Sequence, residues 1–210
     1  MFNYSKDNDN IVTVTMDMQG RSANVINQEF GKLWLDTIDR LEKEKAEIAG
    51  VVLTSAKSTF FAGADIDNLY KQTDAQLIFD MCEGLKKQLR RLETLGKPVV
   101  AALNGAALGG GLEIALACHY RVALNNPKAQ FGLPEVGLGL LPGGGGIVRL
   151  TRMIGLQPAL PLLTEGKRLK VKEAVSNGLI NEIAETAEDM IAKAKAWIKA
   201  NPKAINPWDD

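Results

Sequence analysis

Four segments of the chain have the hydrophobic pattern of β-strands. Residues 11–18 alternate, with apolar side chains such as Val12 and Val14 on one face and polar ones on the other, which predicts a half-buried strand. Two later segments are mostly apolar, as is typical of strands buried on both faces, and a third is predicted to be one further strand. These later segments are residues 50–55, 98–103 and 120–124.

Between these strands, hydrophobic residues recur with helical spacing. Residues 28–45 and 74–95 each place apolar side chains every three or four positions, so each is expected to form an amphipathic helix. A shorter apolar helix is expected before the last strand, and the pattern after Leu150 is helical to the end, with Thr186 capping the final helix. Strands that alternate with helices predict an α/β class with a mainly parallel sheet. We find no repeat or linker, so residues 1–210 are expected to form a single domain.

The charge balance argues against polyanionic partners. The 210 residues include 25 basic and 25 acidic side chains, so no net field attracts nucleic acid or an anionic membrane. The densest basic cluster lies on the polar face of the predicted helix at 74–95, where we expect a solvated surface. It consists of Lys86, Lys87, Arg90 and Arg91.

Targeting signals and membrane spans are not indicated. No apolar run is long enough to span a bilayer, and the polar N-terminus has the pattern of neither a signal peptide nor a transit peptide. We therefore expect no membrane association and a cytoplasmic location. Cys82 and Cys118 lie among apolar residues, so both are expected to be buried free thiols in a reducing compartment.

Three glycine-containing segments stand out from this pattern. The loop at residues 60–66 follows a predicted strand, and such loops commonly bind ligands, although a plain loop with Asp65 as a helix cap is the simpler interpretation of this segment alone. Residues 104–113 open a helix through three consecutive glycines, whose backbone N–H groups could hold an oxyanion without a cation. This segment matches neither a P-loop nor a dinucleotide motif. Residues 131–135 precede another glycine-rich helix start at 140–146.

Two glutamates adjoin these glycine-rich segments. Glu113 lies one turn into an otherwise apolar helix, where a carboxylate is costly unless it is paired or functional. A surface-facing helix position is the alternative for Glu113, and a surface or capping role is the common explanation for a residue such as Glu135. Two acids at two such turns together favour general acid and base catalysis.

Other chemistries fit the sequence less well. His119 is the only histidine and no nucleophile elbow is present, so a Ser-His-Asp triad is not indicated and His119 is expected to be structural. Clusters of metal ligands are missing from the sequence, and we expect no metal site. Glycosidases also use paired carboxylates, but aromatic residues make up only 6% of this chain and leave few candidates for a sugar-binding platform.

The three segments, in this order and spacing, resemble the crotonase (enoyl-CoA hydratase/isomerase) superfamily. The resemblance covers residues 11–200 and rests on Gly-Gly-Gly-Leu-Glu at 109–113 and Leu-Pro-Glu-Val-Gly-Leu-Gly-Leu-Leu-Pro-Gly at 133–143. Residues 117–122 are most similar to the hydratase half of bifunctional fatty-oxidation proteins, which join a hydratase/isomerase domain to a 3-hydroxyacyl-CoA dehydrogenase. The resemblance implies an α/β fold of the ClpP/crotonase type, a spiral of ββα units with a helical C-terminal part.

By position, the resemblance assigns roles to individual residues. The N–H groups of Ala64 and Gly110 would form an oxyanion hole for the thioester oxygen. Glu113 and Glu135 match two catalytic glutamates that position one water. Glu113 would help to activate this water, and Glu135 would protonate the α-carbon. The positions implied to bind substrate are Ala62, Gly63, Ile66, Gly109, Pro134 and Gly143.

The implied activity is that of an enoyl-CoA hydratase of fatty-acid β-oxidation, which adds water to a 2-trans-enoyl-CoA to give a 3-hydroxyacyl-CoA. Both glutamates are present, whereas relatives that only isomerise, hydrolyse or decarboxylate often lack one. Δ3-Δ2-enoyl-CoA isomerisation and non-catalytic binding of CoA esters are the alternatives. No cofactor is expected beyond the coenzyme A of the acyl-CoA substrate. The resemblance leaves homo-oligomerisation open and implies a dehydrogenase domain, and for some relatives a thiolase, as partners in the parent protein.

The sequence departs from the family in two places. Residues 143–148 read Gly-Gly-Gly-Gly-Ile-Val, where relatives commonly have another residue among the glycines and Thr-Gln before the arginine. The chain also ends at Asp210, where relatives continue with helices that roof the acyl pocket and often build the oligomer. We therefore expect an excised or truncated hydratase domain of a longer multifunctional chain.

Overall fold

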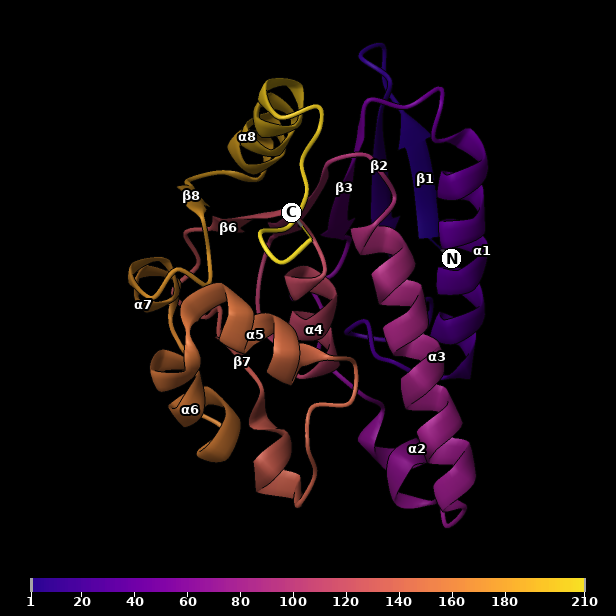
Figure 1. Cartoon of the computed structure of the whole chain (residues 1–210), viewed down its shortest axis with the longest axis vertical. Helices are drawn as coiled ribbons and strands as arrows, with labels where there is room; N and C mark the ends of the chain where they lie inside the picture. Colours follow the sequence, from indigo (N-terminus) through magenta and orange to yellow (C-terminus); the bar gives the residue numbers. More distant parts are fainter. Residues whose placement is uncertain (1, 210) are drawn as a thin grey trace.

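The computed structural model describes residues 2–209 and contains a six-stranded sheet (Figure 1). Neighbouring strands are parallel except for the first pair, which is antiparallel. The α/β class and the mainly parallel sheet are thus confirmed. The strand order is β1 (Phe2–Lys6), β2 (Ile11–Met16), β3 (Gly50–Ser55), β4 (Val99–Leu103), β6 (Tyr120–Leu124) and β8 (Glu182–Ala184).

Helices cover both faces of this sheet. In Figure 1, α8 (Ala187–Ala200) lies on one side of the strands, and α1 (Gln28–Glu44) and α3 (Ala75–Glu93) lie on the other. α4 (Gly110–Leu116) is buried over its whole length on the side of α1 and α3. Within residues 2–209 no helix combines the length and hydropathy needed to cross a bilayer. The remaining helices are α2 (Ile66–Tyr70), η1 (Pro134–Leu138), α5 (Gly146–Ile154), α6 (Leu156–Thr164) and α7 (Val171–Ser176).

The strand β3 shows why the central segments are continuously apolar. Val51 and Leu53 point into the core shared with α1, α3 and α4, whereas Val52 points into the core shared with α8. Because successive side chains of a strand point to opposite faces, a strand between two cores needs apolar residues at every position. The sheet is therefore a rigid frame, covered on both sides.

A second, smaller set of paired segments carries the candidate site. β5 (Ala107–Leu108) pairs in parallel with β7 (Phe131–Gly132). Further bridges join Ile26 to Ala64, Phe61 to Ala107, and Phe131 to Leu169. We call these paired segments the second layer. It brings the three glycine-containing segments side by side, although they are far apart in the sequence.

Four strands are absent from the sequence-based prediction. β1 is an edge strand of mostly polar residues, in which Phe2 and Tyr4 pack against the core. β5 and β7 have two residues each. The pattern after Leu150 predicts helix throughout, which is wrong at β8, a strand of three residues. The mostly polar β1 gives no apolar run, and strands of two or three residues are below the length at which hydrophobic periodicity can be recognised.

The basic cluster on α3 and the cysteines differ in part from expectation. Arg91 donates to Glu42 of α1, and Arg90 also bonds to carboxylates, so these two arginines join structural ion pairs and do not form a merely solvated face. Cys118 is buried as expected, but Cys82 is only half-buried, and both are free thiols. Cys82 is less buried because the first half of α3 extends beyond the sheet (Figure 1).

Candidate active site

The loop at residues 60–66 lies between two other extended segments and hydrogen-bonds to both. On one side, the Ile26 N–H donates to the Gly63 carbonyl at 2.8 Å, and the Asp65 N–H donates to the Ile26 carbonyl at 3.0 Å. On the other side, the Phe61 N–H donates to the segment that leads into β5. The loop is thus the middle segment of the second layer, and hydrogen bonds hold its backbone on both sides.

The backbone N–H groups of Ala64 and Gly110 donate to no other atom of the described chain. We call the place where residues 63–64 meet the start of α4 the junction. N–H groups of an extended segment alternate in direction, and the Asp65 N–H points toward the segment before α1, so the Ala64 N–H points the opposite way. The Gly110 N–H belongs to the first residue of α4 and therefore has no partner within the helix. A β-carbon placed on Gly63 would lie 3.8 Å from the Gly110 nitrogen, which puts both groups at one junction.

Glu113 is buried, and the second glycine-rich turn holds its carboxylate. The residue is 2% exposed, and its Oε1 accepts the N–H groups of Gly144 and Gly146, both at 2.7 Å. Burial raises the pKa of Glu113, and the two N–H groups and the charges of Arg149 and Lys86 oppose this rise. The surface-facing alternative for Glu113 is therefore wrong.

Glu135 lies in the first turn of η1, directly after Pro134. It is half-buried, and its Oε2 is buried with no hydrogen-bond partner among residues 2–209. Burial raises the pKa of Glu135 to about 7, and the negative charge of Glu113 contributes to the rise. A carboxyl group that titrates near neutral pH can both give and accept a proton.

The two carboxylates border consecutive residues at the start of α4. A β-carbon on Gly109 would lie 2.9 Å from Glu135 Oε1, and one on Gly110 would lie 3.8 Å from Glu113 Oε2. Gly109 also has φ 53° and ψ −130°, a conformation that residues with a side chain rarely adopt. Both acids and both unpaired N–H groups therefore meet where the glycine run allows close approach.

The other candidate positions lie in the segments that meet at this junction. Pro134 and Gly143 are half-buried, Gly63 and Gly109 are buried, and the residues at the exposed loop are Ala62, Ala64 and Ile66. Asp65 caps α2 by accepting the Asn68 N–H, and it pairs with Arg21 at 2.9 Å. The cap interpretation of Asp65 is thus confirmed, and the loop around it still forms one wall of the junction.

Some residues at the junction belong to no motif in the sequence. Ile26 packs its side chain directly on Gly110, and Cys82 lies where a β-carbon on Gly143 would be 2.9 Å from its sulfur. Arg149 bonds to the turn that holds Glu113. The apolar face of the predicted helix at 74–95 indicated burial of Cys82, but no pattern indicated which loop would cover it.

His119 has a structural role, as predicted. Its Nδ1 accepts the Val99 N–H at 3.0 Å, which ties the end of α4 to β4. Burial lowers the pKa of His119 and so favours the neutral ring that can accept this bond. In the part of the chain that the structure describes, no three or more His, Cys, Asp or Glu side chains gather in a way that could hold a metal ion.

Comparison with solved structures identifies the class of this fold. The 1.8 Å crystal structure of enoyl-CoA hydratase from Bacillus anthracis superimposes with a TM-score of 0.86 at 29% identity, covering 95% of this chain and 75% of that one. The enoyl-CoA hydratase from Thermoplasma volcanium GSS1 gives a TM-score of 0.82 at 30% identity, with the same coverage of 95% and 75%. The crotonase-like fold expected from the sequence is therefore confirmed.

Sequence comparison identifies the family. The family described as Enoyl-CoA hydratase/isomerase matches residues 6–207, and this chain belongs to it. The fatty acid oxidation complex subunit alpha of Shewanella halifaxensis (strain HAW-EB4) is 45% identical over 185 residues, which cover 86% of this chain and 26% of that protein. The same subunit of Shewanella sp. (strain MR-4) is 40% identical over 215 residues, or 97% and 30%. The chain thus spans less than a third of the length of these curated relatives.

Proposed function

We propose that this chain is an enoyl-CoA hydratase of fatty-acid β-oxidation, adding water to a 2-trans-enoyl-CoA. Family membership supports a reaction of the hydratase/isomerase type. The observation that carries the narrower proposal is the meeting of Glu113, Glu135 and two unpaired backbone N–H groups at one junction. Acid, base and oxyanion donors are the three elements that addition of water to a conjugated thioester needs.

In this proposal the Ala64 and Gly110 N–H groups bind the thioester oxygen. Addition at the β-carbon moves negative charge onto that oxygen in the transition state. Backbone donors that are already in place stabilise this charge without reorganisation, and a single such donor is typically worth about 3–4 kcal/mol. The fixed backbone of the second layer supplies the rigidity that this effect requires.

Glu113 and Glu135 divide the proton transfers. The ionised Glu113 accepts one proton from the water as the water oxygen bonds to the β-carbon, and the protonated Glu135 gives its proton to the α-carbon. One proton is taken and one is given, so H and OH add across the double bond, and exchange with solvent restores both carboxyl groups. With its pKa at about 7, Glu135 keeps a substantial protonated fraction at neutral pH.

The remaining candidate residues would contact the substrate. Ala62 and Ile66 lie on the exposed part of the loop and would flank the coenzyme A moiety through their backbone. Gly143 would lie near the reacting water, since its turn also holds Glu113. The small residues Gly63 and Gly109, with Pro134, would leave room for the thioester. The scheme needs no metal and no cofactor besides the coenzyme A of the substrate.

Isomerisation of a 3-enoyl-CoA to the 2-enoyl-CoA is the second candidate. The observation that favours it is the buried, unpartnered Oε2 of Glu135 in a carboxyl group whose pKa is about 7. Such a group could take a proton from carbon 2 and return it to carbon 4 without any water. Glu113 would then be dispensable.

The parent protein is a further part of the proposal. Because the chain covers 26% and 30% of two proteins named fatty acid oxidation complex subunit alpha, we propose that residues 1–210 are the hydratase domain of a longer multifunctional chain. A dehydrogenase domain in that chain, and a thiolase as a partner, would take the 3-hydroxyacyl-CoA product onward. Detecting a co-purified thiolase with the parent protein tests this part.

Steady-state hydration of crotonyl-CoA, followed by loss of the conjugated thioester's ultraviolet absorbance, tests the proposed reaction. Turnover in the wild type should vanish in Glu135→Gln and fall about 100-fold or more in Glu113→Gln. Glu188→Gln, on the exposed first turn of α8, is the matched control and should leave the rate unchanged. Binding of the CoA ester by a wild type that turns over neither crotonyl-CoA nor a 3-enoyl-CoA would instead indicate a non-catalytic module. Turnover of the 3-enoyl-CoA alone would indicate an isomerase.

A further inference from the structure

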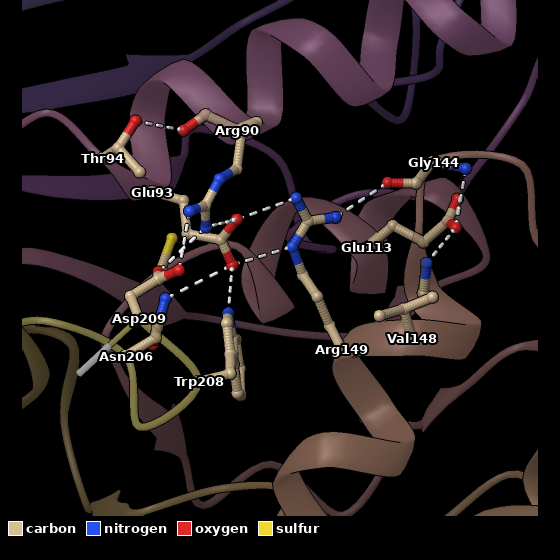
Figure 2. Close-up of polar contacts among 12 residues, drawn as sticks. Arg90, Glu93, Thr94, Glu113, Gly144, Val148, Arg149, Asn206, Trp208 and Asp209 are labelled. Carbon is tan, nitrogen blue, oxygen red and sulfur yellow. Dashed lines mark hydrogen bonds and ion pairs between the residues drawn. The ribbon is translucent and has the colours of Figure 1, made fainter.

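Glu93, near the end of α3, is the centre of a buried network outside the reacting groups (Figure 2). The residue is 4% exposed. The guanidinium of Arg149 donates to both of its oxygens, from Nε to Oε1 at 3.0 Å and from Nη2 to Oε2 at 3.1 Å. Arg90 adds a hydrogen bond to Oε2 at 3.0 Å. This paired geometry fixes the plane of the Arg149 guanidinium.

The C-terminal segment, residues 206–209, completes the surroundings of Glu93. Asn206 Nδ2 and Trp208 Nε1 each donate to Glu93 Oε1 at 3.3 Å. Asp209 accepts two hydrogen bonds from Arg90, at 2.6 and 2.8 Å. Two arginines and two acids therefore balance their charges, and a segment more than one hundred residues away in sequence closes the network.

Arg149 connects this network to Glu113. Its third nitrogen, Nη1, donates to the Gly144 carbonyl at 2.9 Å. The N–H groups of Gly144 and Gly146 donate in turn to Glu113 Oε1. Figure 2 shows the guanidinium lying between the Glu93 carboxylate and the Gly144 carbonyl, with Glu113 on the far side of the turn. The turn is thus held from both sides.

We infer that Arg149 is a positioning residue for Glu113, and that Glu93 together with residues 206–209 sets the orientation of Arg149. All three nitrogens of one planar group are engaged, so a shift at Glu93 rotates the guanidinium and moves the Gly144 carbonyl with it. The catalytic consequence rests on the proposed function. The structural consequence, that Arg149 sets the position of the Glu113 carboxylate, is independent of the proposed function.

The titratable and charged groups that face Glu113 come from three elements. They are Lys86 and Cys82 of α3, Glu135 of η1, and Arg149 of α5. Of these, Arg149 alone also holds the turn that donates to Glu113. Because N–H donors stabilise the ionised carboxylate, loosening the turn should raise the pKa of Glu113 further.

Two variants of the 210-residue chain test this inference, each with a conservative change. Trp208→Phe removes the indole N–H but keeps an aromatic ring, and Arg149→Lys keeps the charge but loses the planar fork. Trp197→Phe is the matched control, because Trp197 is also half-buried but stacks on Tyr120 at 4.6 Å. The readout is titration of Glu113 by carboxyl-carbon NMR after labelling of glutamate, with Glu113→Gln to assign the signal.

The Glu113 titration should move to higher pH in Trp208→Phe and further in Arg149→Lys, and it should stay in place in Trp197→Phe. With crotonyl-CoA, Arg149→Lys should lower kcat about tenfold or more with little change in KM, since misplacing a catalytic group mainly affects the chemical step. An unmoved titration in both variants, with only the melting temperature lowered, would overturn the inference. The NMR titration needs no turnover, so an inactive wild type would count against the proposed function and leave this test valid.

Discussion

Glu113 and Glu135 have different surroundings, although both carboxyl groups border the start of α4. Glu113 Oε1 accepts two backbone N–H groups, whereas Glu135 Oε2 is buried without a partner in the described chain. Burial opposes ionisation of both groups. The charged form of Glu113 is favoured by two backbone N–H groups and by nearby basic side chains, whereas that of Glu135 is favoured by its own backbone N–H and opposed by the charge of Glu113. This difference supports the assignment of base to Glu113 and acid to Glu135.

Hydration should slow as the pH rises through about 7, because Glu135 must be protonated to supply the proton to the α-carbon. The raised pKa of Glu135 means that the active form dominates below this value and is lost above it. The pH profile of kcat/KM for crotonyl-CoA measures this directly. A profile that stays level or rises through the neutral range would contradict the assigned role.

Glu135→Gln should stabilise the fold above neutral pH. The pKa of Glu135 is about 7 in the folded chain and 4.5 ordinarily, so its contribution to stability is full below the ordinary pKa and is lost as pH rises through about 7. A neutral side chain avoids that loss, which we estimate at about 1–2 kcal/mol for this partly buried group. Urea unfolding of both proteins at about pH 5 and about pH 8 checks the sign. An equal difference at both pH values would show that ionisation of Glu135 is not the cause.

Only some of these residues could be predicted from the sequence. Glu113 could be singled out because an acid in an otherwise apolar helix is a local anomaly, and Glu135 because it is a second acid beside a glycine-rich turn. Arg149 could not, because its partner Glu93 lies 56 residues away and only the fold brings them together. The roles proposed for Ala64 and Gly110 came from the resemblance alone, since no side chain in the sequence reveals what a backbone N–H does.

Among the secondary-structure elements, α4 matters most for the candidate site, because its first residues border both carboxyl groups. Its N-cap, Gly109, uses no side chain to cap the helix, and so the first N–H groups stay available. β5 leads directly into the start of α4, and β7 leads toward Glu135. Because the two strands are parallel neighbours, both segments emerge at the same end of the pair. The helix start is thus placed by strands of two residues each.

Gly109→Ala should destabilise the fold by about 1–3 kcal/mol, since a side chain is strained at positive φ and would press on Glu135. It should also reduce hydration by displacing the Glu135 carboxyl. Gly84→Ala is the matched control: it lies inside α3 with open space around it, and should stabilise by about 0.5–1 kcal/mol. Thermal unfolding of the two variants measures both changes in stability. A change of the same sign in both variants would contradict this explanation of the helix start.

Element prediction succeeded where the pattern is long. The helix expected at 28–45 is Gln28–Glu44, and the one expected at 74–95 is Ala75–Glu93. Nineteen residues of amphipathic spacing leave little ambiguity, and Asp74 caps the second helix as a helix-start residue should. β5 and β7 gave no periodic signal, so the second layer that builds the site could be seen only in the structure.

At the scale of the whole molecule, the main sheet and the second layer have separate tasks. The sheet, buried between two cores, holds α4 and the helices in place. The second layer holds the three glycine-containing segments side by side. The C-terminal segment hydrogen-bonds to Glu93 of α3. A site assembled from such distant segments depends on the complete fold, which explains why charge and composition said little about it.

Whether this chain adds water to its substrate can be read from the fate of the water oxygen. Crotonyl-CoA would be incubated with the chain in oxygen-18-labelled water, and the product mass measured, with Glu135→Gln in parallel. We expect 3-hydroxybutyryl-CoA that carries the heavy oxygen in the wild type and no such product in the variant. Recovery of intact, unlabelled crotonyl-CoA from a wild type that binds the ester would contradict the proposed addition of water.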